Sequence, residues 1–496
     1  MRNLALAAVL ATQLCTLAAC RRSEPPMRNP ERFAATPPEG TTEGTTAGTP
    51  VGKDKPTADQ ACNKAEPAGP LRWFHDDYDG ALACARARKV PLVVDLWAPW
   101  CHTCLSMQTT VFQEPELAPM AERFVFVALD TDREINARAL GKLSIGAWPT
   151  FYVLASTDEA VQSRFVGAAS KAQFLDFLAH GSRGAAPGSP ADDLLRQGER
   201  AATIKDHAAA VTSYRAALAA AKADWSRRPD ALVSLAGALR KTGDLAACLT
   251  LGESSLEDTG QTASATDFLV NTLDCAAGLA ETERARVTAF RDKAAARLAS
   301  LLDHPAAQLS VDDRSDAMMN LRTLQDALGR KDAARATATR QRALLDEAAA
   351  KAATPLAAMT YNWPRAEVTV YLGKGAELVA DLEKSAAALP QEYDPPYRLA
   401  WTLWKSGRPE QAAAWCDKAV ARAYGPRKAR VLGLAADLAA ERKDLEAERK
   451  ARAAMVATYE SLPPEQAAPE ALAKAKEALA ALEARAAGKP AAPAAK

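Results

Sequence analysis

Histidines are few in this sequence, the cysteines include only one closely spaced pair, and the net charge is almost zero. Lys and Arg total 62 and Asp and Glu total 61, so the charge balance does not favour nucleic acid or another strongly charged partner. The five histidines are scattered, and one Cys-x-x-Cys pair cannot supply the four ligands of a structural zinc site. We therefore expect no metal site.

Long apolar stretches are also missing after the first twenty residues, so no segment there can span a bilayer as a helix. The chain starts with a positive residue, Arg2, followed by apolar runs from Leu4 to Leu10 and from Leu14 to Ala19. This stretch is too short for a transmembrane helix and is typical of a secretory signal. We predict a signal peptide over residues 1–19 and a soluble, periplasmic remainder.

The signal segment ends in Leu17-Ala18-Ala19-Cys20, which resembles the lipobox of bacterial lipoproteins. In that family the signal peptidase cuts before the Cys, and the Cys thiol is lipidated. The resemblance implies that Cys20 carries lipid chains, which hold a protein on a membrane without spanning it. Arg21 follows, and the absence of Asp there favours the outer membrane. The alternative is a plain secretory signal in which Cys20 is incidental.

Residues 20–68 are rich in Pro, Gly and Thr and offer few side chains for a core, which predicts a disordered tether. From Leu71 onward, patterns typical of strands and helices alternate. The expected strands cover 71–74, 91–97, 124–129, 150–154 and 161–166, and the expected helices cover 76–89, 101–112, 133–140 and 170–180. This order predicts an α/β domain over residues 69–182 that ends in an antiparallel hairpin.

A Gly- and Pro-rich linker at 183–191 separates this domain from a tract without strand signals, which continues to residue 486. Small residues recur in the tract, among them Ala400, Gly407, Ala412 and Ala419. Their spacing resembles that of tetratricopeptide repeats (TPRs), in which paired helices pack closely at small residues. The resemblance implies an all-α, TPR-like helical solenoid over 192–486, followed by a disordered tail over 487–496. A generic helical solenoid remains the alternative, and the stretch from about 260 to 360 is helical but out of phase.

The segment from Leu92 to Cys104 carries the chemistry. An apolar strand that includes Asp95 runs directly into Trp97-Ala98-Pro99-Trp100-Cys101-His102-Thr103-Cys104. This pattern resembles the thioredoxin superfamily. The resemblance covers about residues 71–180, with Trp148-Pro149-Thr150 where the family has its cis-proline. It implies the thioredoxin fold and thiol–disulfide exchange at the dithiol.

Helix geometry independently favours redox chemistry at Cys101. This residue is predicted at a helix N-terminus, where unpaired N–H groups and the helix dipole stabilise a thiolate. The thiolate is the species that attacks a disulfide. Cys104 lies one turn later, within reach of a mixed disulfide. We therefore predict Cys101 as the nucleophile and Cys104 as the resolving thiol.

Two ionisable residues are expected to support the dithiol. The resemblance places Asp95 near Cys104, where burial would raise its pKa and let it take the proton of Cys104. The alternative is a strand-end carboxylate without a role. His102, when protonated, would stabilise the Cys101 thiolate, and its alternative is an exposed histidine at a helix start.

The resemblance assigns roles to three more residues. Trp100 precedes the nucleophile in the motif, Pro149 is expected in the cis form facing the dithiol, and Trp148 offers its backbone to a substrate peptide. Relatives more often carry a smaller residue at the position of Trp148 and a Lys at that of Leu105. Oxidising relatives have His at the second intervening position, not at the first, which leaves the direction of exchange open.

Two further patterns concern the type of thioredoxin relative that the chain resembles and the pairing of the other cysteines. The span from Phe124 to Trp148 shows no inserted helical subdomain, and its start resembles the periplasmic C-terminal domain of DsbD-type reductases. The remaining cysteines give two candidate structural pairs, Cys62–Cys84 and Cys248–Cys275. Burial as small apolar residues is their alternative. Cys416 is the odd one, which we expect to be buried and inert.

Together these features predict a membrane-tethered thiol–disulfide oxidoreductase of the protein-disulfide reductase type, lipid-anchored in the periplasm. It needs no dissociable cofactor, because the electrons reside in the cysteine pair. Its expected partners are exported proteins with disulfides or thiols, an electron-donating membrane or periplasmic redox protein, and the membrane. The alternative is a lipoprotein scaffold in which the repeats assemble proteins and the thioredoxin domain serves for docking or as a chaperone.

Overall fold

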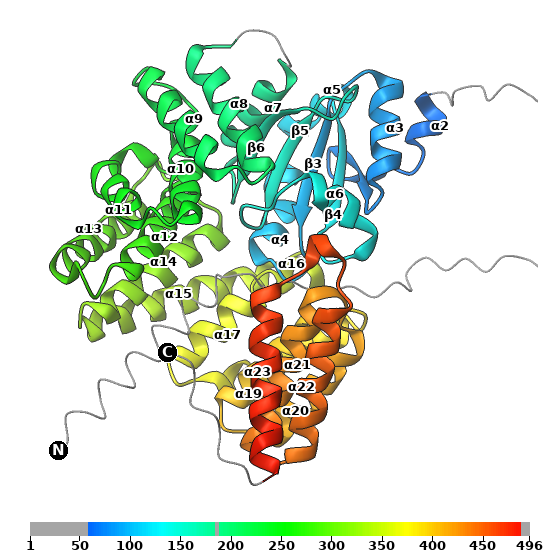
Figure 1. Cartoon of the computed structure of the whole chain (residues 1–496), viewed down its shortest axis with the longest axis vertical. Coiled ribbons are helices and arrows are strands. Elements are labelled where there is room, and N and C mark those ends of the chain that lie inside the picture. The colour runs from blue at the N-terminus through cyan, green and yellow to red at the C-terminus, as the bar shows by residue number, and fades with distance from the viewer. Residues whose placement is uncertain (1–57, 184–187, 488–496) are drawn as a thin grey trace, which may run out of the picture.

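The computed structural model describes residues 58–183 and 188–487, which form an α/β domain and a long helical tract (Figure 1). The predicted signal peptide, Cys20 with its lipid and most of the predicted tether lie outside the described residues. The predicted tail, from residue 488 on, lies outside them as well.

One mixed sheet forms the centre of the α/β domain. Its strands are β1 (Glu66–Ala68), β2 (Leu71–His75), β3 (Leu92–Trp97), β4 (Val125–Asp130), β5 (Thr150–Leu154) and β6 (Val161–Val166), in the order β1-β2-β4-β3-β5-β6. β2, β4 and β3 run parallel, whereas β5 and β6 form the antiparallel hairpin that the sequence predicted. β3 and β4 are buried along their whole length, as expected for near-continuous apolar runs.

Helices cover both faces of this sheet. They are α2 (Ala58–Cys62), α3 (Tyr78–Arg88), α4 (His102–Thr109), α5 (Met120–Arg123), α6 (Ala137–Lys142) and α7 (Lys171–Ser182), with 3-10 turns η2 (Val111–Gln113), η3 (Pro115–Leu117) and η4 (Glu134–Asn136). Because strand side chains alternate between the two faces, the sheet feeds two apolar cores. One core contains Cys104 of α4 and Phe174 of α7, and the other contains Leu82 of α3 and Leu140 of α6.

The ordered domain begins earlier than the sequence indicated. α2 and β1 lie inside residues 20–68, all of which had been assigned to a disordered tether. A disulfide bond joins Cys62 of α2 to Cys84 of α3, and β1 pairs with β2 in antiparallel register. These two links hold a segment whose own composition is too polar to form a core.

The helical tract consists of successive helices that pack on their neighbours. They are α8 (Pro190–Thr203), α9 (His207–Ala220), α10 (Arg228–Thr242), α11 (Leu245–Ser254), α12 (Ala263–Gly278), α13 (Arg284–Asp303), α14 (Val311–Ala327), α15 (Lys331–Lys351), α16 (Pro355–Met359), α17 (Asn362–Tyr371), α18 (Val379–Ala388), α19 (Asp394–Lys405), α20 (Pro409–Arg422), α21 (Gly425–Glu441), α22 (Leu445–Glu460) and α23 (Pro469–Ala486), with 3-10 turns η5 (Glu257–Thr259), η6 (Gly375–Leu378) and η7 (Pro464–Gln466). α8 and α9, α14 and α15, α19 and α20, and α21 and α22 make the most extensive helix pairs.

Small residues lie where these helices approach each other. Ala400, Ala412 and Ala419, which suggested the repeat, are fully buried between α19, α20 and their neighbours. Gly407 connects α19 to α20 with a φ of +74°, a left-handed conformation that favours glycine. The residues from 260 to 360, which showed no repeat phase, form the regular helices α12 to α15 and the short α16.

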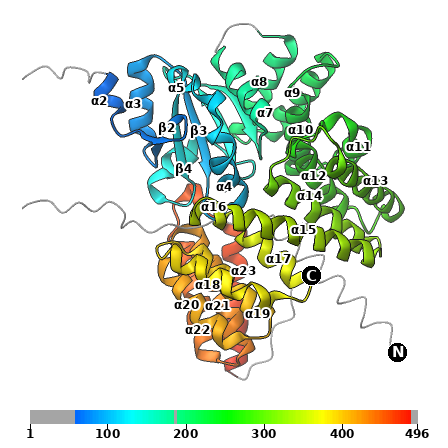
Figure 2. The same cartoon turned by 180° about the vertical axis from the view of Figure 1, so that it is seen from behind.

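The tract curves round the α/β domain and contacts it at several points (Figures 1 and 2). Near its start, the buried Arg227 donates hydrogen bonds to Ser163 of β6 and to the carbonyl oxygen of Arg164. Further along, α14 and α16 pack against α4. Past α20, the Tyr424 hydroxyl donates to Asp130 at the end of β4. The repeats and the sheet domain therefore share interfaces instead of being separated by a free linker.

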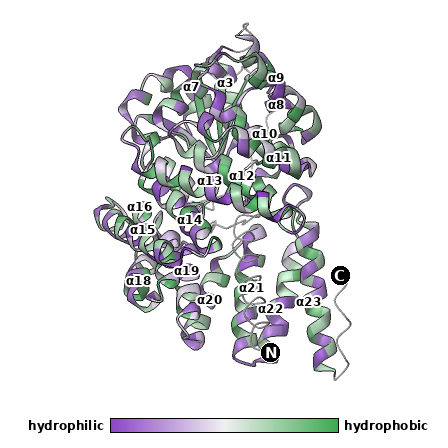
Figure 3. Ribbon diagram, turned by 90° about the vertical axis from the view of Figure 1, so that its left-hand side faces the viewer, coloured by the Kyte–Doolittle hydropathy of each residue, from purple (hydrophilic) through white to green (hydrophobic). Residues whose placement is uncertain are grey.

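Within the described ranges, no helix is both long enough and apolar enough to cross a membrane. Figure 3 shows hydrophilic and hydrophobic residues interspersed along the helices of the tract.

Candidate active site

The two cysteines of the motif lie where β3 leads into α4. Cys101 is the N-cap residue of α4, and its Sγ accepts a hydrogen bond of 3.0 Å from the backbone N–H of Cys104. The two residues are joined by a disulfide bond. The geometry agrees with the prediction that Cys101 sits at a helix N-terminus, with Cys104 one turn away. A thiolate at Cys101 would receive the same N–H donation.

Asp95 lies in the middle of β3 and is almost fully buried. Because side chains alternate along a strand, Asp95 shares a face with Val93 and Trp97, which belong to the same apolar core as both cysteines. Its Oδ1 has no hydrogen-bond partner among the described residues. Burial raises the pKa of Asp95 well above its ordinary value, so its carboxylate is a stronger base than an exposed one.

The loop before β5 faces the motif through two tryptophans. The peptide bond between Trp148 and Pro149 is cis, as the resemblance implied. The ring of Trp148 packs edge-to-face on that of Trp100, with 5.3 Å between centroids. The Trp148 indole N–H donates to the Thr131 hydroxyl at 2.9 Å, which orients the ring. Both tryptophans pack against the apolar core that contains Cys101.

His102 turns away from bulk solvent toward the repeats. Its Nδ1 lies 2.9 Å and 3.0 Å from the two carboxylate oxygens of Asp312, which is 1% exposed. Burial alone lowers the pKa of His102, but the charges of Asp312 and Asp316 outweigh burial and raise it to about 9. The alternative interpretation, an exposed histidine at a helix start, is wrong. Nothing in the sequence pointed to Asp312, because it is distant in the chain and stands in no motif.

Three residues of the repeats pack on the active-site side of the α/β domain, and we call them the repeat cover: Leu356 and Met359 of α16 and Arg427 of α21. Leu356 and Met359 pack into the apolar core that contains both cysteines. The fully buried Arg427 lies over the ring of Trp100, 4.7 Å from its centroid. Cys101 is 4% exposed and Cys104 is 1% exposed. The dithiol is therefore closed to a protein-sized partner in this arrangement.

A second polar contact ties the repeats to the active-site side of the sheet. The Tyr424 hydroxyl donates a hydrogen bond of 2.6 Å to Asp130, which is fully buried. Asp132, two residues further on, is also buried, and burial together with the charge of Asp130 raises its pKa well above its ordinary value. Sequence reasoning missed these acidic residues because they follow an ordinary-looking strand.

One group in the described part of the chain has the make-up of a cation site. His102, Asp312 and Asp316 each bring one ligand atom to within 4.8 Å of the others. With its pKa raised to about 9, the His102 ring is protonated at neutral pH and has no lone pair to give a metal ion. We therefore interpret the group as an ion-pair cluster.

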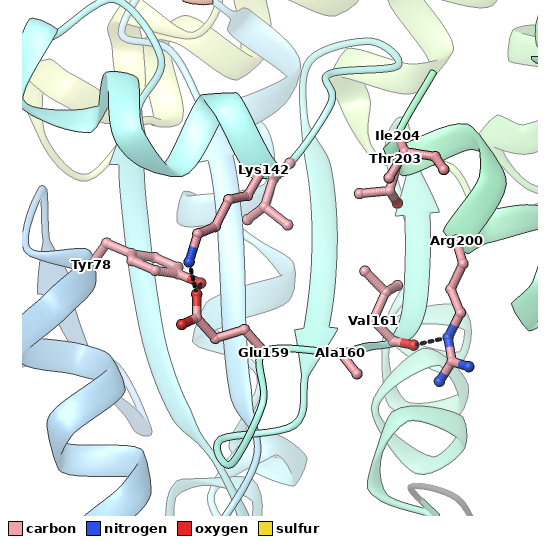
Figure 4. Close-up of a pocket in the computed structure, with 9 residues that line it drawn as sticks. Tyr78, Lys142, Glu159, Ala160, Val161, Arg200, Thr203 and Ile204 are labelled. Atoms are coloured by element: carbon pink, nitrogen blue, oxygen red, sulfur yellow. Dashed lines mark hydrogen bonds and ion pairs between the residues drawn. The ribbon is translucent and has the colours of Figure 1, made fainter. Parts of the chain in front are cut away.

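A hollow of about 340 Å³ lies elsewhere, lined by residues of α3, α6, β6 and α8 (Figure 4). Its polar groups are paired within the protein. Glu159 accepts hydrogen bonds from Tyr78 and Lys142, and Arg200 donates to the carbonyl oxygen of Val161. None of the residues described as lining it belongs to the Cys-x-x-Cys motif, and we assign no role to it.

Five other cysteines lie in the described part of the chain. Both predicted pairs, Cys62–Cys84 and Cys248–Cys275, form disulfide bonds. Cys416 is a buried free thiol, as predicted. Burial raises its pKa to about 12, so almost none of it is thiolate at neutral pH.

Comparison with known proteins agrees with this description of the α/β domain. Residues 73–154 match the family model described as thioredoxin-like. The chain contains a thioredoxin-like domain. With the paired helices that follow, the predicted fold class, a thioredoxin fold joined to TPR-like repeats, is confirmed.

Two solved structures with similarity to the chain are repeat proteins. A tetratricopeptide repeat protein from Parabacteroides merdae is 16% identical, with a TM-score of 0.38, and the match covers 58% of this chain and 100% of that one. A thermophilic TPR protein of Thermus thermophilus is 21% identical, with a TM-score of 0.28, and the match covers 43% of this chain and 99% of that one. No curated protein matches the sequence.

Proposed function

We propose that this protein is a thiol–disulfide oxidoreductase of the protein-disulfide reductase type, with Cys101 and Cys104 as its reacting groups. The observation that carries the proposal is the position of Cys101 as N-cap of α4, bonded to Cys104. Two further features support it. Asp95 lies on the face of β3 that packs into the core of both cysteines, and the peptide bond before Pro149 is cis. The thioredoxin-like domain supports redox chemistry in general.

In the proposed reaction, the reduced pair gives two electrons to a client disulfide. The Cys101 thiolate attacks one client sulfur, which forms a mixed disulfide and releases the other client sulfur as a thiolate. Cys104 then passes its proton to the Asp95 carboxylate and attacks Sγ of Cys101. This step breaks the mixed disulfide, releases the second client thiolate and leaves the Cys101–Cys104 disulfide. A donor dithiol must then supply two electrons to restore the Cys101 thiolate and the Cys104 thiol, and Asp95 returns to Cys104 the proton that it took.

We further propose that the protein works at a periplasmic membrane surface. The lipobox-like end of the signal segment supports lipidation of Cys20, and Arg21 favours the outer membrane. No dissociable cofactor enters the proposed reaction. The partners would be exported proteins with disulfides or thiols and a redox protein that donates electrons.

The scaffold alternative has one observation in its favour. The repeat cover closes the dithiol, and a module used only for docking does not need an accessible thiol. In that role the helical tract would bind proteins along its surface, as solenoids do. A redox measurement separates the two proposals.

The test is the reduction potential of the Cys101–Cys104 pair in the full chain, equilibrated with glutathione or dithiothreitol buffers. A Cys101→Ser variant identifies the signal, because the two structural disulfides remain. A reductase should give a reversible two-electron couple near about −270 mV, as thioredoxin does, whereas a value near about −120 mV would indicate an oxidant. Absence of any reversible couple would overturn the proposal and favour the scaffold.

A further inference from the structure

α14 begins at a rigid, well-capped point beside α4. Ser310 caps α14 through a capping box with Asp313, so the first turn of the helix is fixed. The Ser106 hydroxyl of α4 donates a hydrogen bond of 3.3 Å to Ser310 itself. α14 is therefore held against the redox helix at its N-terminal end.

This contact places Asp312 opposite His102. Both carboxylate oxygens lie within 3.0 Å of Nδ1, and the carboxylate is 1% exposed while the imidazole is 20% exposed. A carboxylate in that position orients the ring and favours its charged form. The repeats thus contribute a buried charge to the residue between the two cysteines.

The other charged groups around His102 belong to the repeats. Asp316, one turn after Asp312 on α14, adds a second negative charge, and Arg398 of α19 acts in the opposite direction. Asp313 lies beside Asp312, and burial and that neighbour raise its pKa to about 6. Asp312 and Asp316 outweigh both burial and Arg398 at the imidazole.

We propose that Asp312, supported by Asp316, is a positioning residue for the dithiol: it holds His102 as an oriented imidazolium next to Cys101 throughout the neutral pH range. The chemical consequence rests on the proposed function, because an adjacent cation lowers the pKa of an attacking thiolate. The ion pair itself does not depend on that function. The repeat domain would then take part in the redox site as well as in protein binding.

The test measures two titrations in the reduced full chain: the ring proton signals of His102, and the pH profile of Cys101 alkylation by iodoacetamide. The chain has five histidines, and His102→Gln identifies the relevant signal. Asp312→Asn keeps the size and an acceptor but removes the charge. Asp312→Glu restores the charge, and Asp326→Asn removes a charge from the same helix further along.

We expect Asp312→Asn to lower the His102 midpoint by about one pH unit or more, because burial then outweighs the remaining attraction. The midpoint of Cys101 alkylation should rise by about one unit. Asp312→Glu should recover most of both shifts, and Asp326→Asn should leave both midpoints in place. A merely structural role for Asp312 would change stability but neither midpoint.

A His102 midpoint that moves by less than about half a unit in Asp312→Asn would overturn the proposal. The proposal would also be overturned if the titration midpoint of His102 shifted while the pH profile of Cys101 alkylation stayed the same. The charge on His102 would then have no effect on the pKa of Cys101. If Asp312→Asn does not fold, Asp316→Asn replaces it, with smaller shifts of the same sign expected. The histidine titration does not need a working redox couple, so the proposal and the proposed function can fail separately.

Discussion

At the scale of single residues, the site contains two ionisable groups, Asp95 and His102, whose pKa values are raised above their ordinary values. Asp95 is buried in a strand with an unpaired carboxylate oxygen, which costs free energy whenever the group is charged. His102 keeps its proton because carboxylates from the repeats surround it. Under the proposed function both pKa shifts serve disulfide exchange, and both should be measurable without a substrate.

Replacing Asp95 with Asn should stabilise the protein in a pH-dependent way. The native state keeps the Asp95 proton to a higher pH than the unfolded state does, so stability falls as pH rises from the ordinary carboxyl pKa through the raised native value. Asp95→Asn should therefore raise Tm more at pH 8 than at pH 4. Thermal unfolding at both values tests this. An equal change in Tm at both pH values would show that the pKa of Asp95 is not raised in the native state.

At the scale of elements, short segments are secured by covalent and hydrogen-bonded links. α2 has only five residues, too few to be stable alone, and the Cys62–Cys84 disulfide ties it to α3. α14 is fixed at its start by the capping box of Ser310. Such links decide where an element begins in cases where propensity alone does not.

Removal of the Cys62–Cys84 bond should destabilise the thioredoxin-like domain. The bond closes a loop with a sequence separation of 22, for which the chain-entropy estimate is about 3 kcal/mol. The double variant Cys62→Ala/Cys84→Ala should unfold at a lower denaturant concentration. The unfolding midpoint is measured from the near-ultraviolet circular dichroism of the tryptophans. Cys416→Ala, which removes a buried thiol but no bond, is the matched comparison. An unchanged midpoint would mean that the β1–β2 pairing suffices.

At the scale of the whole molecule, the repeats contact the thioredoxin-like domain directly. The tract curves from β6 round to α4 (Figure 1). The repeat cover packs on the core that contains both cysteines and on Trp100. Under the proposed function, a client protein reaches Cys101, which is 4% exposed, by displacing this cover. Access to the thiol is then an equilibrium between closed and open arrangements, whose balance depends on the interdomain contacts.

Loosening the interface should expose the dithiol. Tyr424→Phe removes only the hydroxyl that donates to Asp130, and a hydrogen bond to a charged group contributes about 1.5–3 kcal/mol. The reduced variant should therefore react roughly 10- to 100-fold faster with a protein-sized maleimide reagent. Tyr371→Phe removes a comparable Tyr–Asp bond of 2.7 Å within the repeats and should have no effect. Equal rates for Tyr424→Phe and the unchanged chain would mean that the interface does not control access.

The redox motif and the elements around it could be predicted because their signals are local. The strand with Asp95, the Cys-x-x-Cys pair and the apolar runs of β3 and β4 show in a few consecutive residues. Disulfide partners could be proposed but not decided, since spacing leaves alternatives that only proximity resolves. The start of the domain was placed too late because β1 is polar and depends on pairing with β2.

The sequence by itself determined the α/β order, the helical tract, the position of Cys101 at a helix start and the candidates for its supporting residues. Each follows from periodicity or from a motif within one segment. Tertiary structure alone decided that Asp312 pairs with His102, that Arg427 covers Trp100 and that Tyr424 reaches Asp130. These partners come from distant parts of the chain, and they meet because the packing of many helices sets the curvature of the tract, which no local pattern encodes.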